Sequence, residues 1–173
     1  PTPSAPTMLV AGFPMHRIKG TNPHHDTQCK IRAAAPVSGT VLDTTMGLGY
    51  TAIMAAETAV SVTTIELDPT VVDVCRHNPW SAKLFTAPNI SRRIGSAFDE
   101  ISTFPNQQFD RILHDPPTFK LAGELYSAQF YEQTLRVLKP KGRLFHYIGD
   151  PSSKSGAGVT RGVVRRLKEV GFR

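Results

Sequence analysis

Two short stretches of the sequence combine a carboxylate with residues that control the shape of the backbone. In the first, Asp43 follows an apolar pair suited to a buried strand and precedes Gly47 and Gly49. Because neither glycine carries a Cβ, the chain can turn sharply there and approach a ligand closely. The helix expected from Tyr50 would present unpaired N–H groups to that ligand. A carboxylate at Asp43 is poorly placed for a pyrophosphate but suits a ligand that carries an ammonium or a sulfonium group.

The second stretch is Asp115-Pro116-Pro117, which directly follows another apolar segment suited to a strand. The two prolines fix the loop and remove backbone N–H donors that would compete with a ligand. An aromatic residue, Phe119, follows after Thr118. A bare Asp-Pro-Pro can also be a simple turn, but its position after a strand favours a functional loop.

Two more expected strand ends carry residues suited to binding. Glu66 ends a strand rich in β-branched residues, where its carboxylate could accept both hydroxyl protons of a ribose. Leu67 follows it, and Ser96-Ala97-Phe98 follows the next expected strand. Glu66 could instead be a surface acid, and Phe98 could belong to the core.

Strands and helices alternate along the chain. Strands are expected at 41–44, 62–67, 90–94, 109–114 and 143–148. Helices are expected at 50–57, 69–77, 98–101, 124–138 and 159–170. This alternation predicts an α/β fold with a doubly wound, mainly parallel sheet flanked by helices, whose ligands bind at the carboxyl ends of the strands.

The first 35 residues are expected to form an extension that precedes this core. A hairpin could pair 7–10 with 15–18, and Asp26 or Thr27 could cap a helix running to about residue 35. We therefore divide the chain into an extension, 1–35, and a sheet domain, 36–173. His16, Arg17, Asp26 and Lys30 could close a ligand pocket from this side, or they could serve only packing and surface roles.

Composition limits the class of protein. The 173 residues include two cysteines without a CxxC pair, no metal-ligand cluster of usual spacing and no apolar run near the ~20 residues that span a bilayer. We expect a cytoplasmic protein that does not enter the membrane and holds no metal. The net charge of +6 and pI near 9.6 suit a nucleic-acid partner or a solvated basic face.

The motifs together resemble those of the class I, Rossmann-like methyltransferases that use S-adenosylmethionine (SAM). The stretch from Asp43 to Gly49 resembles their motif I, with Thr45 in place of its first glycine. Leu138-Lys139-Pro140-Lys141-Gly142 resembles their junction between the fourth helix and the fifth strand. Their fold normally adds two further antiparallel strands after the last helix found here, and we expect the chain to lack them.

The resemblance implies specific roles for the motif residues. It implies cofactor binding by a set that covers the four strand ends: Asp43, Thr44, Gly47, Gly49, Tyr50, Glu66, Leu67, Ser96, Ala97, Phe98 and Asp115. Asp115-Pro116-Pro117 resembles the motif of methyltransferases that act on nitrogen, in which the acid and a backbone carbonyl hold the target amine. Catalytic roles then fall to Asp115, Pro116, Pro117 and Phe119, although Thr118 shifts the aromatic residue by one place.

The similarity extends over nearly the whole chain to a little-characterised group of predicted methyltransferases best known from archaea. It rests on several segments, including Met15-His16-Arg17, Asn78-Pro79-Trp80-Ser81, His114-Asp115-Pro116-Pro117, Leu121-Ala122-Gly123-Glu124-Leu125-Tyr126-Ser127 and Phe145-His146-Tyr147. This group supplies no substrate. The Asp-Pro-Pro motif implies methyl transfer to an amino nitrogen of a nucleic acid, a protein or a small amine, and the basic charge favours RNA among them.

Three other functions stay open on sequence grounds. An aminopropyltransferase would use decarboxylated SAM on the same fold, although the basic net charge disfavours a cationic substrate. A non-catalytic nucleic-acid-binding module would bind RNA or DNA in a salt-sensitive way without a cofactor. A nicotinamide oxidoreductase also fits the two glycines, but no hydride-transfer residues accompany them. Neither the acceptor nor the oligomeric state follows from the sequence.

Overall fold

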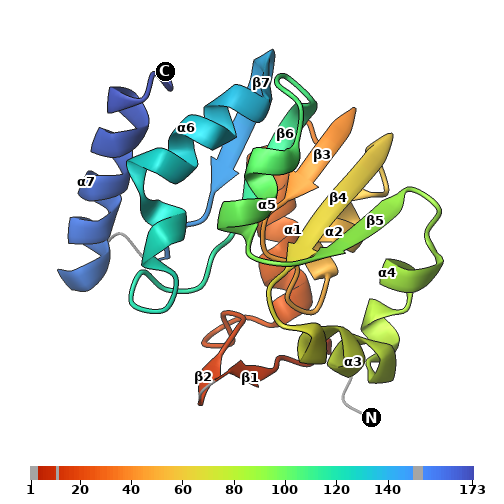
Figure 1. The fold of residues 1–173 in the computed structure, drawn as a ribbon. Coiled ribbons are helices and arrows are strands. Elements are labelled where there is room, and N and C mark those ends of the chain that lie inside the picture. Colours follow the sequence, from red (N-terminus) through yellow and green to blue (C-terminus); the bar gives the residue numbers. More distant parts are fainter. Residues whose placement is uncertain (1–3, 11, 150–153) are drawn as a thin grey trace.

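A five-stranded parallel sheet forms the centre of the computed structural model, which describes residues 4–10, 12–149 and 154–173. Its strands lie in the spatial order β5-β4-β3-β6-β7 (Figure 1). Their bounds are Thr40–Asp43 for β3, Ser61–Glu66 for β4, Ile90–Ile94 for β5, Phe109–His114 for β6 and Leu138–His146 for β7. The order reverses between β4 and β6 on either side of β3, so β3 lies at the topological switch point. The doubly wound α/β fold predicted from the sequence is confirmed.

Helices cover both faces of this sheet. They are α1 (Pro23–Ala34), α2 (Tyr50–Ala55), α3 (Pro69–His77), α4 (Lys83–Thr86), α5 (Ala97–Thr103), α6 (Ala128–Val137) and α7 (Lys154–Glu169). Two short 3₁₀ helices, η1 (Pro79–Ser81) and η2 (Gly123–Tyr126), complete the connections. Figure 1 shows α5, α6 and α7 on one side of the sheet and α1 and α2 on the other.

Each face of the sheet packs into its own hydrophobic cluster. Neighbouring residues of β3 point to opposite faces, so Val41 packs toward α1 and α2 while Leu42 packs toward α5 and α6. Strand β6 does the same with Leu113 and Ile112. Because both faces are covered, the buried pairs Val41–Leu42 in β3 and Ile112–Leu113 in β6 are apolar on both sides of the sheet, as in other parallel sheets.

The N-terminal segment differs from expectation in its bounds. A hairpin forms, but its strands are β1 (Leu9–Val10) and β2 (Phe13–Pro14), so the partner strand begins directly after Gly12 and not at residue 15. Helix α1 begins at Pro23, earlier than expected, because the Asn22 side chain accepts a hydrogen bond from the His25 N–H and caps the helix.

Three later elements also differ. The helix expected at 124–138 is divided into η2 and α6, because Ser127 caps a new helix by accepting a bond from the Phe130 N–H. Strand β7 begins at Leu138, five residues early, and bulges opposite Asp110, which holds Lys139 at 2.7 Å. Helix α7 begins at Lys154, five residues before the start expected at 159; residues 151–153 lie outside the described residues.

No helix among the described residues combines the length and the apolar character needed to cross a bilayer.

Candidate active site

Asp43 ends β3 at the switch point of the sheet and is completely buried. The Thr64 hydroxyl donates to its Oδ2 at 2.7 Å, while its Oδ1 has no hydrogen-bond partner within the described residues. Burial raises the pKa of Asp43 to about 7, despite the bond from Thr64. A buried carboxylate oxygen without a donor is costly, so this site is suited to a ligand that brings a donor or a positive charge.

The loop after β3 depends on two glycines. Gly49 has a φ of 77°, and a Cβ there would lie 2.8 Å from Leu84, so conformation and space both require glycine. At Gly47, with a φ of 52°, a Cβ would meet nothing within 4 Å. The backbone at Gly47 is therefore open on the side where a side chain would stand, as expected for a loop that touches a ligand.

Glu66 fixes this loop from the next strand. Its Oε2 accepts the Gly47 N–H at 3.0 Å and its Oε1 accepts the Asp68 N–H at 3.1 Å, which orients both carboxylate oxygens. Burial raises the pKa of Glu66, although these N–H groups oppose the shift. Each oxygen retains a lone pair for a hydroxyl group, so Glu66 fits the predicted ribose contact.

Apolar side chains stand exposed at the ends of β4 and β5. Leu67 is 68% exposed and Ile94 is 50% exposed, although both follow or end strands of the central sheet. Side chains of this type could pack on the planar base of a nucleoside whose ribose binds Glu66. Leu67 follows Glu66 directly, and Ile94, which pairs with Glu66 across the strands, is an exposed apolar neighbour that sequence reasoning did not select.

The residues after β5 contribute mainly to local structure. The Ser96 hydroxyl accepts the Phe98 N–H at 3.2 Å and caps α5, and Ala97 is buried. The Phe98 ring is stacked on Phe130, with centroids 6.4 Å apart, and packs against the core cluster beneath α5 and α6. These contacts place Phe98 in the core, which is one of the two alternatives that the sequence left open.

Asp115 lies in a buried ion-pair cluster at the end of β6. The Lys30 Nζ is 2.6 Å from Asp115 Oδ2 and 2.9 Å from Asp26 Oδ2. Burial lowers the pKa of Lys30, but Asp115 and Asp26 together raise it above its ordinary value, so Lys30 carries its proton. Burial raises the pKa of Asp115, and the Lys30 ammonium opposes this by favouring the carboxylate. Helix α1 therefore contributes directly to the site.

The Asp-Pro-Pro loop leaves two acceptors free. Within the described residues, neither Asp115 Oδ1 nor the Pro116 carbonyl receives a hydrogen bond. The Pro117 carbonyl accepts the Tyr126 hydroxyl at 2.9 Å, which holds the loop. Phe119 is 48% exposed and its ring contacts Tyr126 edge-on, with centroids 5.5 Å apart. The loop thus carries two free acceptor oxygens and an exposed aromatic ring, which are groups suited to contact with a planar amine.

Two hydrogen bonds connect the loop after β3 to the Asp-Pro-Pro loop. The Thr45 hydroxyl donates to the Asp115 carbonyl at 2.8 Å. His114 Nε2 lies 3.0 Å from the Leu125 carbonyl, which can only accept, so Nδ1 accepts the Thr44 hydroxyl at 2.7 Å. Thr45, which stands where motif I has glycine, thus supplies a side-chain hydroxyl donor that glycine lacks. Sequence reasoning missed this role, as well as those of His114 and Tyr126.

The other predicted residues lie farther from the free acceptors. The Tyr50 hydroxyl donates to the Pro6 carbonyl at 3.0 Å and accepts the Asn78 amide at 2.8 Å. His16 contacts the Tyr50 ring with centroids 5.2 Å apart, and burial lowers the pKa of His16 to about 4, so its imidazole is neutral. Arg17 is exposed. Of the four N-terminal candidates, Lys30 contacts Asp115 and Asp26 pairs with Lys30, whereas within the described residues His16 and Arg17 form no such pair.

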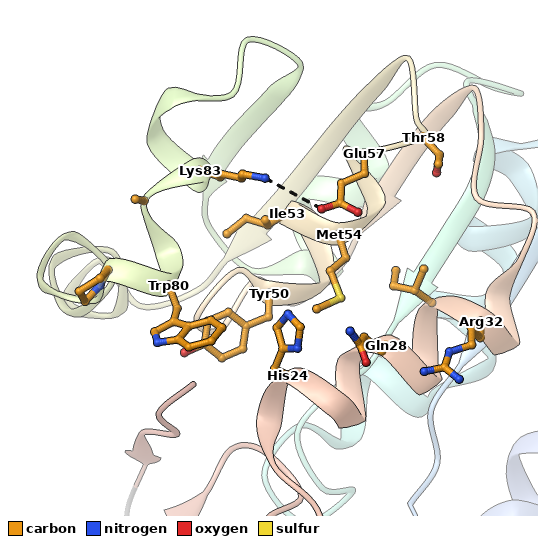
Figure 2. A pocket seen from close by; sticks show the side chains of 13 residues that line it. His24, Gln28, Arg32, Tyr50, Ile53, Met54, Glu57, Thr58, Trp80 and Lys83 are labelled. Carbon is orange, nitrogen blue, oxygen red and sulfur yellow. Dashed lines mark ion pairs between the residues drawn. The ribbon is translucent and has the colours of Figure 1, made fainter. Parts of the chain in front are cut away.

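A separate groove of about 620 Å³ lies between α1, α2 and η1 (Figure 2). His24, Gln28 and Arg32 line it from α1, and Trp80 lines it from η1. Tyr50 lines its floor at the start of α2. Neither the free oxygens of the Asp-Pro-Pro loop nor Glu66 lines this groove, so it is distinct from the strand ends described above.

Comparison with curated proteins finds two relatives. A protein of Methanocaldococcus jannaschii of uncharacterised function is 48% identical over 96% of this chain and 58% of its own length. Polyamine aminopropyltransferase 2 of Streptomyces coelicolor is 29% identical over 56% of this chain and 18% of its own length. The chain thus spans less than two thirds of either relative.

Comparison with solved structures supports the fold. A spermidine synthase in complex with the transition-state analogue AdoDATO superposes with a TM-score of 0.74 at 18% identity, over 83% of this chain and 51% of the synthase. At the sequence level, the pattern of the methyltransferase small domain matches residues 29–151, which include β3 to β7 and the site described above. The chain therefore belongs to the methyltransferase small domain family.

Proposed function

We propose that this chain binds SAM at the carboxyl ends of β3, β4 and β5 and transfers its methyl group to an amino nitrogen held by the Asp-Pro-Pro loop. The observation that carries the proposal is the pair of free acceptors, Asp115 Oδ1 and the Pro116 carbonyl, at the end of β6. An amine that donates to both oxygens is held with its lone pair in a defined direction. Membership of the methyltransferase small domain family agrees with this chemistry.

The residues at the strand ends fit the chemical groups of SAM. The unpartnered Oδ1 of Asp43 suits a cationic group, Glu66 suits the ribose hydroxyls, and the exposed Leu67 suits the base. Gly47 has no Cβ and nothing stands within 4 Å of where one would be, which leaves the backbone accessible. Three groups of the ligand thus find chemically matched partners at the ends of the adjacent strands β3 and β4.

The chain's part in the reaction is mainly alignment. When bound, SAM supplies an electrophilic methyl group on its sulfonium. Asp115 and the Pro116 carbonyl orient the acceptor nitrogen, and alignment of this kind can contribute roughly 7–11 kcal/mol. As the nitrogen becomes positively charged, the same oxygens stabilise it. Thr45 and Tyr126 hold the loop, so the oxygens need no rearrangement during transfer.

Charge favours an uncharged planar amine, such as the amino group of an RNA base, as the acceptor. The Lys30 ammonium stands 2.6 Å from Asp115 Oδ2 and would repel a protonated aliphatic amine bound beside it. A base amino group carries no charge and could lie against the exposed Phe119 ring. The net charge of +6 suits the phosphates of such a substrate.

Binding of S-adenosylhomocysteine, the demethylated product, tests the proposal. We expect calorimetry to show micromolar affinity for S-adenosylhomocysteine and none for NAD, since Asp43 is poorly placed for a pyrophosphate. Transfer of a radioactive methyl group from SAM to RNA would then identify the acceptor class. Failure to bind S-adenosylhomocysteine would contradict the proposed function.

Replacing Glu66 with glutamine is expected to weaken S-adenosylhomocysteine binding by roughly ten- to a hundredfold, because charge-assisted hydrogen bonds to the ribose become neutral ones. Calorimetric dissociation constants of the two proteins measure this. Glu132→Gln, an exposed carboxylate on α6, is the matched control and should bind normally. An unchanged affinity in Glu66→Gln would exclude Glu66 from the ribose site.

Affinity for S-adenosylhomocysteine should rise with pH through about 7. Burial raises the pKa of Asp43 to about 7, so the carboxyl is neutral below this pH and negatively charged above it. Only the charged form attracts the ammonium of the ligand. For the same reason, ionising Asp43 lowers the stability of the unliganded fold between about pH 4 and 7. Asp43→Asn should remove the pH dependence of binding; a slope that persists in this variant would assign it to another group.

A second candidate function is aminopropyl transfer from decarboxylated SAM. Similarity to the Streptomyces coelicolor aminopropyltransferase favours it. The substrate of such an enzyme is a polyamine, whose cationic groups would compete with Lys30 for Asp26 and Asp115. Incubation of the chain with decarboxylated SAM and putrescine, followed by a search for spermidine, separates the two functions.

A further inference from the structure

The groove between α1, α2 and η1 has an exposed aromatic face at one end. Trp80 is 42% exposed, and its backbone N–H donates to Asn78 Oδ1 at 3.2 Å. The His24 ring meets the indole edge-on, with centroids 5.5 Å apart. Figure 2 shows Trp80, Tyr50 and His24 gathered at this end. One large aromatic side chain thus stands partly exposed on a hydrogen-bonded turn at this end of the groove.

Hydrogen-bond donors continue from this aromatic end along α1. His24, Gln28 and Arg32 recur every four residues, so they share one face of the helix and line the groove together. Within the described residues, the side chains of Gln28 and Arg32 make no hydrogen bond or ion pair. The acid of the lining, Glu57, lies 4.0 Å from Lys83 and is balanced by it. Arg32 therefore leaves a positive charge available in the groove.

The base of the groove is fixed in advance. The Asn78 amide donates to the Tyr50 hydroxyl and to Ser81 Oγ, both at 2.8 Å, and Ser81 donates to the Leu48 carbonyl at 2.7 Å. These bonds join η1, which carries Trp80, to the loop that holds Gly47 and Gly49. The groove thus borders the proposed cofactor loop from its outer side, and little rearrangement is needed for a ligand to enter.

We propose that this groove binds a short segment of single-stranded RNA, with a base stacked on Trp80 at one end and a phosphate farther along the strand at Arg32. An aromatic platform beside a positively charged groove is the usual means of binding single strands. Lining donors without partners, and an acid already paired with Lys83, select an anionic ligand that carries acceptors. This proposal rests on the proposed function in one respect. If RNA is the methyl acceptor, the groove is the site that holds it near the Asp-Pro-Pro loop.

The fluorescence of Trp80 reports on this groove alone, because the chain contains one tryptophan. We expect a short single-stranded RNA to quench this fluorescence, with an affinity that falls as salt rises. Adenosine monophosphate is then tested in place of RNA, to distinguish a free nucleotide from a strand. Quenching by both ligands would assign the site to the nucleotide itself. Quenching by RNA alone would assign it to the strand. Polyglutamate is the anionic control and should have no effect.

Substitutions locate the site. Arg32→Gln should weaken RNA binding about tenfold, whereas Arg161→Gln, an exposed arginine on α7, should change it less than twofold. Trp80→Ala should weaken the binding of a labelled RNA measured by anisotropy, and Trp80→Phe should restore much of it. Absence of quenching, equal quenching by polyglutamate, or equal losses in the two arginine variants would overturn the proposal.

The same variants separate this proposal from the proposed function. Arg32→Gln should leave S-adenosylhomocysteine binding unchanged, and Glu66→Gln should leave the quenching by RNA unchanged. Quenching by RNA in a chain that fails to bind S-adenosylhomocysteine would preserve the groove and reject the methyltransferase proposal. The reverse result would reject the groove and preserve the enzyme.

Discussion

An Asp115→Ala variant is expected to lose methyl transfer by at least about a hundredfold while binding S-adenosylhomocysteine within about twofold of the original chain. The carboxylate is proposed to hold the acceptor, so its loss removes an interaction made to the reacting amine. The cofactor contacts are proposed to come mainly from Asp43, Gly47 and Glu66, which the substitution leaves in place. Rates of radioactive methyl transfer to RNA, with calorimetry on the same samples, measure the two effects.

The Asp115→Asn variant separates two effects of this side chain, orientation of the amine and negative charge. An amide keeps one oxygen that can accept a hydrogen bond from the amine, but it loses the charge that pairs with Lys30. Partial activity in Asp115→Asn with none in Asp115→Ala would assign the effect to orientation of the amine. Loss of activity in both would assign it to the negative charge, which also stabilises the developing positive nitrogen.

Asp110 provides a matched control on the same strand. It also accepts a lysine ammonium, from Lys139 at 2.7 Å, but it lies near the opposite end of β6. Lys139 and Thr40 hold the pKa of Asp110 at about 2, which is typical of a carboxylate with a structural role. Asp110→Ala should leave the rate of methyl transfer per folded molecule unchanged. Equal loss of activity in the two variants would contradict the catalytic role of Asp115.

The sequence predicted the elements of the sheet domain because its local signals are strong. Residues 69–77, 90–94 and 109–114 form their elements with the predicted bounds. Pro69 marks the start of the helix, and apolar residues mark the two strands: Ile90 and Ile94 at the ends of the first, and Ile112 with Leu113 within the second. Glu66, Gly47 and Asp115 lie at strand ends because the alternation of strands and helices brings those ends to one edge.

The contacts between loops were not predictable in the same way. Lys30 reaches Asp115 across 85 positions of sequence, and Thr45 reaches the carbonyl of Asp115 across 70. A sequence pattern shows neither the direction of a side chain nor the distance between two loops. Thr45 did carry one signal, since it stands where motif I has glycine. The hydroxyl explains the departure, because it donates to the Asp115 carbonyl and so joins the loop after β3 to the Asp-Pro-Pro loop.

A Lys30→Met variant is expected to be less stable by about 3–5 kcal/mol, because breaking a buried ion pair leaves an uncompensated charge. The side chains of Lys30 and Asp26 are each 8% exposed and that of Asp115 is 23% exposed, so water screens the cluster poorly. Without the ammonium, burial should raise the pKa of Asp115 further above its ordinary 3.8. Urea unfolding measures the change in the free energy of unfolding.

The loss of stability in the Lys30→Met variant should become larger as pH rises. A carboxyl whose pKa is raised in the folded state binds its proton more tightly there, so the variant loses stability as pH rises above about 4. Below that pH, Asp115 is protonated in both states and the deficit shrinks. Lys139→Met is the matched control: its pair with Asp110 is more exposed, at 39% and 32%, and should contribute about 1 kcal/mol or less.

Removing the negative charge of Asp26 should recover part of the stability that the Lys30→Met variant loses. In the double variant Asp26→Asn with Lys30→Met, one carboxylate no longer lies unpaired beside Asp115, so the two changes should not add. The cycle of single and double variants gives the coupling energy between Asp26 and Lys30. A coupling near zero, or a Lys30→Met deficit no larger than that of Lys139→Met, would show that the cluster is not a buried electrostatic unit. In that case α1 would pack on the site without setting the charge of Asp115.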